Sequence, residues 1–246
     1  MQYLYLVKSE EELKKLSEYA KSIIPQFNEY LAFLKENYRV YDLPRSIILT
    51  DCNTATRAVN ALPLPAYTND YRTVMAPDKK TWKALYLKQL DCYDNTAAAA
   101  AVQKYYDGLS ERNVLQILGH EMVHHSDLFI DETYETNLWF EEGMAEYISR
   151  KYFLSEEEFE AEKQINLALS KLYEEKFGKP ALSDFTLETY EKGIVHVFYL
   201  YWRSFLTIDA AVKKHGGDVL SVFKSYHDWY ECGAKTPLEE HLISDR

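Results

Sequence analysis

The chain has 246 residues, of which 47% are hydrophobic and 27% charged, and it contains only 8 glycines and 7 prolines. This composition excludes a disordered or collagen-like chain, and the length suffices for one large core or for two lobes that share a cleft. The formal net charge is -11, and the sequence has no basic cluster. We therefore expect neither nucleic acid nor an anionic membrane surface as a partner, since both bind patches of lysine and arginine.

Cysteine usage and the N-terminal segment bear on the compartment. Cys52, Cys92 and Cys232 are widely spaced and form no C-x-x-C pair, which indicates free thiols in a reducing environment. The first residues lack a basic region followed by an apolar one, and no apolar run approaches the roughly 18 residues of a membrane-spanning helix. We expect a cytoplasmic protein without a membrane span and leave a processed, secreted form open.

The N-terminal part of the chain predicts one strand followed by helix. The alternation from Gln2 to Val7 is typical of a short strand. Ser9 and Glu12 form a capping box that opens a helix. We expect Pro25 to kink or break this helix, because proline removes one backbone donor, before a second helical piece that ends near Lys35.

The segments up to the middle of the chain predict a mixed α/β region. The residues from Arg45 to Thr50 form the clearest strand and are followed by a turn at Asp51 to Asn53. The prolines and the Asn-Asp pair after Ala61 predict a loop and then a strand from Tyr71 to Ala76. The segment from Trp82 to Leu90 fits a strand or a helix, whereas the alanine-rich segment from Thr96 to Tyr106 predicts a helix.

The sequence His120-Glu121-Met122-Val123-His124 is an HExxH motif within an apolar-periodic segment that predicts a helix from Glu111 to Asp127, with Ser110 as its N-cap. Histidines four residues apart project from one helical face, so both imidazoles can bind one ion, and Zn²⁺ suits nitrogen ligands combined with a carboxylate. Glu121 points to a neighbouring sector, where it can accept a proton from the attacking water without ligating the metal.

A catalytic zinc site needs a third protein ligand, and the segment from Trp139 to Tyr147, WFEEGMAEY, offers acidic candidates. Further on, Ser155 to Glu158 is a capping box for a helix that runs to about Phe177. The segment from Leu187 to Leu206 predicts another helix, which begins with Tyr190-Glu191-Lys192-Gly193. The glycines at 216 and 217 and the Thr-Pro pair at 236 delimit two more helices. The second half is therefore expected to be entirely helical.

The HEMVH and WFEEGMAEY segments together resemble the gluzincin zinc metallopeptidases, and YEKG resembles a segment of their membrane alanyl aminopeptidase group. The resemblance covers about residues 110 to 230. It implies an α+β, thermolysin-like catalytic domain over residues 1-246, with a mixed α/β lobe with a small sheet (1-108), an all-helical lobe (109-246) and a zinc cleft between them.

The resemblance also assigns roles to individual residues. It makes Glu142 the third metal ligand, because the family's ligand directly precedes the glycine; Glu141 is the rival candidate. Glu146 lies one turn further on and is implied as the hydrogen-bond partner of His120. Tyr190 corresponds to the tyrosine whose hydroxyl stabilises the oxyanion. His196 is a second candidate for that role, although a lone histidine is more often part of the core or of the rim.

The resemblance extends to the substrate but has gaps. In gluzincins the strand ahead of the zinc helix is the cleft edge, so the backbone from Arg72 to Ala76 is a candidate for pairing with an extended peptide; an edge strand covered by a loop is the alternative. The interval between His124 and Glu142 is one residue shorter than usual, and no G-x-M-E-N segment precedes the zinc helix, so exopeptidase action is not supported.

We therefore expect a zinc metallopeptidase that acts on a peptide or protein substrate. The first alternative is a catalytically silent peptide-binding or scaffold protein with the same fold. The second is a hydrolase that attacks a non-peptide bond, which a narrow, closed cleft without a free strand edge would favour. The sequence does not specify the substrate preference, the endo- or exopeptidase mode, the physiological target, the regulation or the oligomeric state.

Overall fold

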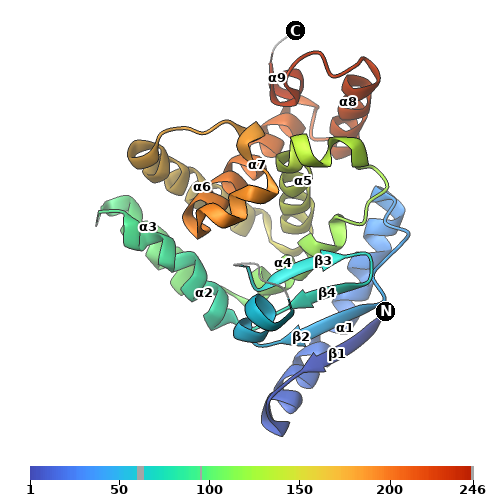
Figure 1. Ribbon diagram of the computed structural model, residues 1–246, viewed down its shortest axis with the longest axis vertical. Coiled ribbons are helices and arrows are strands. Elements are labelled where there is room, and N and C mark those ends of the chain that lie inside the picture. The colour runs from blue at the N-terminus through green and yellow to red at the C-terminus, as the bar shows by residue number, and fades with distance from the viewer. Residues whose placement is uncertain (60–63, 95, 245–246) are drawn as a thin grey trace.

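The computed structural model describes residues 1–59, 64–94 and 96–244. Its fold is α+β and mostly helical, with one small mixed sheet (Figure 1). Among the described helices, none combines the length and the apolar character that a membrane crossing requires.

The sheet contains four strands in the order β1-β2-β4-β3. Strands β1 (Gln2–Leu6), β2 (Ser46–Thr50) and β4 (Arg72–Met75) run parallel, and β3 (Ala66–Asn69) pairs with β4 in the antiparallel direction. The predictions of β1, β2 and β4 are confirmed. Strand β3 was expected to be loop, although residues 61–63 of that expected loop lie outside the described part of the chain.

The expected cleft edge from Arg72 to Ala76 is wrong, because β4 has β2 on one side and β3 on the other. The edge strand is β3. A tight hairpin joins the two strands, and the side-chain oxygen of Asn69 accepts hydrogen bonds from the backbone of Tyr71 and Arg72. Strand β3 has only four residues and follows Pro65, so its local pattern is too short to indicate a strand.

Helix α1 (Glu10–Tyr38) is continuous, which contradicts the expected break at Pro25. A proline within a helix removes one backbone hydrogen bond and crowds the preceding turn, which destabilises the helix locally. Helix α1, however, buries an apolar stripe along its whole length. The stripe consists of Leu16, Ala20, Ile23, Phe27, Tyr30 and Leu34. Packing on both sides of Pro25 therefore holds the helix together. The side chain of Ser9 caps it, as predicted.

Short helices connect the sheet to the second half. The expected turn after β2 is instead the start of a helical segment that includes Thr54–Val59, and the carboxylate of Asp51 accepts hydrogen bonds from its first backbone amides. Helix α2 (Lys79–Lys88) decides the ambiguous segment in favour of a helix. Helix α3 (Ala97–Asp107) confirms the helix predicted for the alanine-rich segment, and the side chain of Thr96 caps it.

From residue 109 to residue 244 the regular elements are helices. They are α4 (Glu111–Val123), α5 (Tyr134–Phe153), α6 (Glu156–Phe177), α7 (Ile194–Lys214), α8 (Val219–Glu231) and α9 (Leu238–Ile243). The expectation of one helix from Leu187 to Leu206 is wrong. A short 3-10 segment, Leu187–Lys192, ends at Gly193, whose φ of 99° is left-handed and interrupts the helix before α7.

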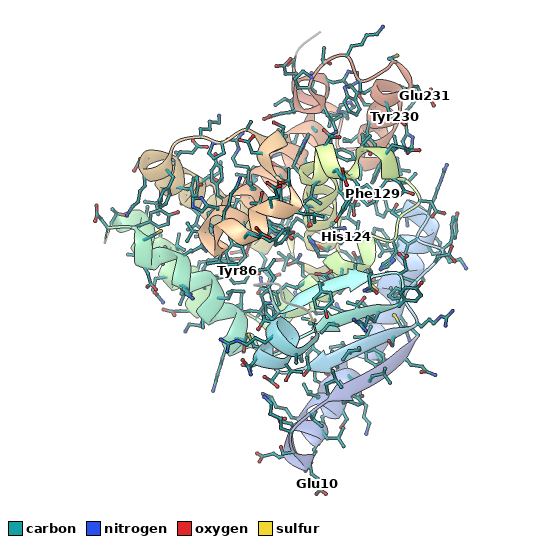
Figure 2. The ribbon with its side chains drawn as sticks, in the orientation of Figure 1. Glu10, Tyr86, His124, Phe129, Tyr230 and Glu231 are labelled. Carbon is teal, nitrogen blue, oxygen red and sulfur yellow. The ribbon has the colours of Figure 1, made fainter. Side chains whose placement is uncertain are left out.

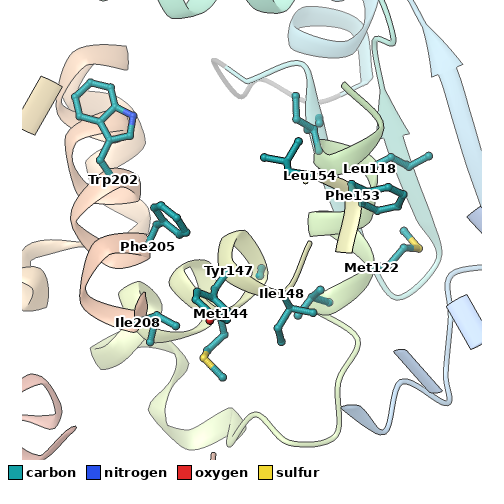
Figure 3. Packing of buried hydrophobic residues seen from close by; sticks show 14 of the residues in the cluster. Leu118, Met122, Met144, Tyr147, Ile148, Phe153, Leu154, Trp202, Phe205 and Ile208 are labelled. Atoms are coloured by element: carbon teal, nitrogen blue, oxygen red, sulfur yellow. The ribbon is translucent and has the colours of Figure 1, made fainter. Parts of the chain in front are cut away.

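One hydrophobic core includes residues of both halves, among them Ile47 and Trp82 from the first half and Leu118 and Phe205 from the second. Figure 3 shows side chains of α4, α5 and α7 that belong to this core. Helix α5 packs most extensively against α7 and α4, so it is the element that fixes the position of its acidic segment relative to the HExxH motif.

Candidate metal centre

Helix α4 carries the HExxH motif. The side chain of Ser110 accepts a hydrogen bond from the backbone N–H of Asn113, and the side-chain oxygen of Asn113 accepts one from the backbone N–H of Ser110, as in a capping box. The helix ends at Val123, four residues before the predicted end, but His124 keeps a helical backbone with φ −56° and ψ −19°. His120 and His124 therefore remain on one face. In Figure 2 the labelled His124 lies between the sheet and the helices of the second half.

Helix α5 runs antiparallel to α4, because Gln116 bonds Ser149 near one end and His124 bonds Glu141 near the other. This pairing places Glu142 opposite the two imidazoles. Gly143 allows α5 to approach α7 closely: a Cβ atom at this position would lie only 2.8 Å from the backbone oxygen of Ser204. The glycine after the candidate ligand thus has a packing role.

The side chains of His120, His124 and Glu142 converge on one point. The His120 Nε2 atom lies 3.1 Å from His124 Nε2 and 3.1 Å from Glu142 Oε2, and the third distance, between His124 Nε2 and Glu142 Oε2, is 3.5 Å. In a tetrahedral zinc site with bonds of about 2.0 to 2.2 Å, neighbouring ligand atoms lie roughly 3.3 to 3.6 Å apart. One of the three distances falls in this range and the other two are slightly shorter, so the three atoms lie close to the arrangement of one face of such a site.

The charge balance also favours a cation. Glu141, Glu142 and Glu146 contact the two imidazoles, and His120, Glu121 and Glu142 are at most 7% exposed. Burial alone would raise the pKa of Glu142, but His124 and His120 hold it well below its usual range. Burial alone would lower the pKa of His124, but Glu142 and Glu141 raise this pKa well above the usual value of a histidine. The donor set thus fits Zn²⁺, which would take the place of a proton at the Nε2 atom of each imidazole while the Nδ1 protons remain.

Each imidazole has a second carboxylate partner on α5. Glu146 Oε1 lies 3.4 Å from His120 Nδ1, within ion-pair distance on the expected side of the ring, but His120 Nδ1 forms no hydrogen bond among the described residues. Glu141 Oε1 lies 2.6 Å from His124 Nδ1. The sequence reasoning considered Glu141 only as a rival ligand and missed this role. A ligand histidine commonly donates its other N–H to an acceptor, and this rule could have indicated a carboxylate partner for His124.

Glu121 lies apart from the three converging atoms. It lines a cavity of about 50 Å³ together with His120, Tyr86 and Tyr201. Burial raises the pKa of the Glu121 carboxyl to about 7. A carboxylate with a pKa near neutrality is suited to accept a proton and release it again.

Tyr190 lies beside the candidate metal ligands, in the 3-10 segment before α7. Its hydroxyl lies 3.2 Å from Glu142 Oε1, the oxygen that is not among the three converging atoms, and 2.8 Å from the hydroxyl of Tyr201. Burial raises the pKa of both tyrosines well above the ordinary value, so both hydroxyls stay neutral donors. Tyr201 was not predicted, because nothing distinguishes it locally among 21 tyrosines.

The other two candidates lie elsewhere. The Nδ1 atom of His196 lies 2.5 Å from the hydroxyl of Tyr173, and its ring packs against Phe177 on α6. This environment is that of a half-buried packing residue. Arg72 is exposed at the start of β4. No interaction among the described residues joins either side chain to the three converging atoms.

The outer side of the site is open. A hollow of about 540 Å³ is lined by His124 and His125 and by five acidic residues, and the described lining contains no lysine or arginine; the acids are Asp42, Asp70, Asp127, Asp131 and Glu132. The side chain of His125 hydrogen-bonds Thr68 of β3 at 2.8 Å, which ties the end of α4 to the edge of the sheet.

The chain was compared with models of protein families, with curated proteins and with solved structures. None of the three comparisons finds a match.

Proposed function

We propose that this chain is a zinc-dependent metallopeptidase of the gluzincin type, with a thermolysin-like catalytic fold. The observation that carries the proposal is the convergence of His120 Nε2, His124 Nε2 and Glu142 Oε2 at mutual distances of 3.1 to 3.5 Å, with the buried Glu121 beside them. Two nitrogens and one carboxylate oxygen form the ligand set of a catalytic zinc site that keeps one position open.

His120, His124 and Glu142 would hold the ion. When bound, zinc acts as a Lewis acid that lowers the pKa of a coordinated water and polarises the carbonyl of the substrate. Glu121 takes a proton from the water that attacks the peptide carbonyl, and it then delivers this proton to the leaving amine as the C–N bond breaks. Water attacks directly, so no acyl-enzyme forms.

Tyr190 is the proposed oxyanion donor. Without substrate its hydroxyl donates to Glu142 Oε1. A substrate carbonyl that develops negative charge is a competing acceptor in the same place, and a neutral phenol that donates to charge formed in the transition state accelerates the reaction.

The proposed peptide-binding edge is β3. Among the described residues this strand pairs on one side only, with β4. Leu64 and Ala66 line the same cavity as His120 and Glu121, so the edge lies next to the candidate centre. An extended peptide can add to such an edge as a further strand.

One observation favours the second candidate function, hydrolysis of a small non-peptide substrate. The cavity beside Glu121 holds only about 50 Å³, and Glu121 itself is 7% exposed. A narrow site of this kind suits a small molecule, whereas the edge of β3 and the outer hollow suit a peptide.

The experiment is a digestion of a mixed peptide library by the protein as purified, after chelation and after Zn²⁺ is restored. We expect cleavage that chelation abolishes and zinc restores, and Glu121→Gln should bind zinc but lose activity. Zinc binding without any peptide cleavage would contradict the peptidase proposal. Hydrolysis of small esters or amides would then support the second candidate function, and the absence of any hydrolysis would support a catalytically silent binding protein. Loss of zinc with turnover intact would contradict the role of Glu121.

A further inference from the structure

A second buried charge cluster lies behind His120. Arg150 follows Glu146 by one turn of α5 and is 7% exposed. Its Nη2 atom lies 2.8 Å from Glu146 Oε2 and 3.5 Å from Glu162 Oε1 on α6. The guanidinium carbon lies 4.2 Å from the centre of the Phe205 ring on α7. Three helices thus enclose this cation.

Glu162 is anchored on its other side. It is also 7% exposed, and one of its oxygens accepts a hydrogen bond from the hydroxyl of Tyr105 on α3. The other oxygen lies 3.5 Å from the side-chain nitrogen of Asn166. Tyr105, Glu162, Arg150 and Glu146 therefore form a continuous polar chain from α3 to the partner of His120.

Buried charges of this kind are poor evidence for stability, because the loss of hydration offsets most of the attraction between the charges. Packed apolar side chains would fill the same space at no such cost. The position of the chain offers another explanation, since its last member, Glu146, places its free oxygen 3.4 Å from His120 Nδ1. A ligand histidine that binds a metal through one nitrogen carries its proton on the other, and an acceptor for that proton fixes the tautomer and the orientation of the ring.

We propose that Arg150 is a positioning residue of the metal centre: with Glu162 as its anchor, it holds the Glu146 carboxylate in place to accept the Nδ1 proton of His120. The Nε2 lone pair of His120 is then directed at the ion. Arginine is required here because its planar guanidinium offers several donors in a fixed arrangement to two carboxylates, whereas a lysine offers a single point charge. This inference rests on the metal site of the proposed function and is independent of whether peptides are the substrate.

The test is a double-mutant cycle on zinc affinity, measured by competition with a chromophoric chelator. Arg150→Met is expected to weaken zinc binding by about 10- to 100-fold, the usual effect of losing an outer partner of a ligand histidine. In a Glu146→Gln background the same substitution should have little further effect, because Arg150 acts through Glu146. Arg150→Lys should fall between wild type and Arg150→Met.

Arg203→Met is the matched control. Arg203 on α7 is also largely shielded and pairs with Glu174 at 3.0 Å, but its described contacts do not reach the metal ligands. Its replacement should lower stability and leave zinc affinity unchanged. The visible absorption spectrum of the Co²⁺-loaded protein gives a second readout, which Arg150→Met should change and Arg203→Met should not.

Equal zinc affinity in wild type and Arg150→Met, or additive effects of Arg150→Met and Glu146→Gln, would overturn the inference. Should Arg150→Met fail to fold, Glu162→Gln and Arg150→Lys decide: both are expected to weaken zinc binding at least threefold, and unchanged affinity in both would also overturn it. Absence of zinc binding in the wild type would instead contradict the proposed metal centre itself.

Discussion

The two sides of the candidate metal centre differ in how their charges are compensated. On the inner side, His120, Glu146, Arg150 and Glu162 form an enclosed network in which each charged group has a partner of opposite sign or a hydrogen bond. On the outer side, His124 lines a hollow of about 540 Å³ with five acidic residues and no described lysine or arginine. The inner side borders only the cavity of about 50 Å³ that Glu121 also lines, whereas the outer side is an open, acidic hollow.

The largest effect is expected for Tyr190→Phe, because it removes the proposed oxyanion donor, whose hydroxyl contacts Glu142. We expect a loss of about 10²- to 10³-fold in kcat with unchanged zinc content. Steady-state kinetics on a cleaved peptide and metal analysis measure both quantities. Tyr199→Phe is the control, since its hydroxyl bonds Glu174 away from the site. A similar loss in both variants would show that a general packing defect is responsible.

Glu141→Gln tests the outer side alone. The carboxylate of Glu141 is the only described partner of His124 Nδ1, at 2.6 Å, and a neutral amide is a weaker acceptor. Zinc affinity should fall by about 10-fold, at the lower end of such effects, because this side is closer to water. Glu132→Gln, in the acidic hollow that His124 lines, should leave zinc affinity unchanged. If Glu141→Gln binds zinc as the wild type does, His124 needs no such partner.

Gly143→Ala tests the packing that supports both sides. The added methyl group would collide with Ser204 and Ile208 of α7, so the free energy of unfolding should fall by about 1 to 3 kcal/mol. Urea denaturation measures the change. Lys171→Ala, at an exposed position of α6, should change the same quantity by less than about 0.5 kcal/mol. A Gly143→Ala protein as stable as the wild type would mean that α5 and α7 can separate without cost.

The smallest expected effect concerns His125 at the outer rim. Burial lowers the pKa of His125 to about 4, and His124 adds to this shift. The unfolded chain takes up this proton near pH 6.5, so the metal-free protein should lose stability as the pH falls from about 6.5 toward 4, with no further loss from this group below 4. Urea denaturation at several pH values should show a shallower decline in His125→Gln. An identical decline would exclude this contribution.

The sequence predicted the parts of the site that depend on local spacing. The i and i+4 histidines, the capping residues Ser110 and Ser155 and the general position of the acidic helix need only helical geometry, which neighbouring residues impose. Which carboxylate partners which imidazole depends on the register of α5 against α4, and that register is set by packing. Glu146 could therefore be placed near His120 from the sequence, whereas the contacts of Glu141 with His124 and of Tyr201 with Tyr190 could not.

The sheet shows the opposite case. The edge position was assigned to β4, because a four-residue strand such as β3 leaves no periodic pattern, and strand order depends on contacts that are distant in sequence. The break predicted at Pro25 follows from the local effect of proline on a helix. The burial of the apolar side chains along the whole of α1, which outweighs that effect, depends on the tertiary structure. Gly193 interrupts the expected long helix through its left-handed backbone, which sequence alone did not reveal.

The most direct measurement is a titration of the metal-free protein with Zn²⁺, with elemental analysis of the product and of His120→Ala, His124→Ala and Glu142→Ala. The account predicts one tightly bound zinc per chain in the wild type and loss of that ion in each variant. A wild type that binds no zinc in excess metal, or variants that retain it with unchanged affinity, would contradict the account.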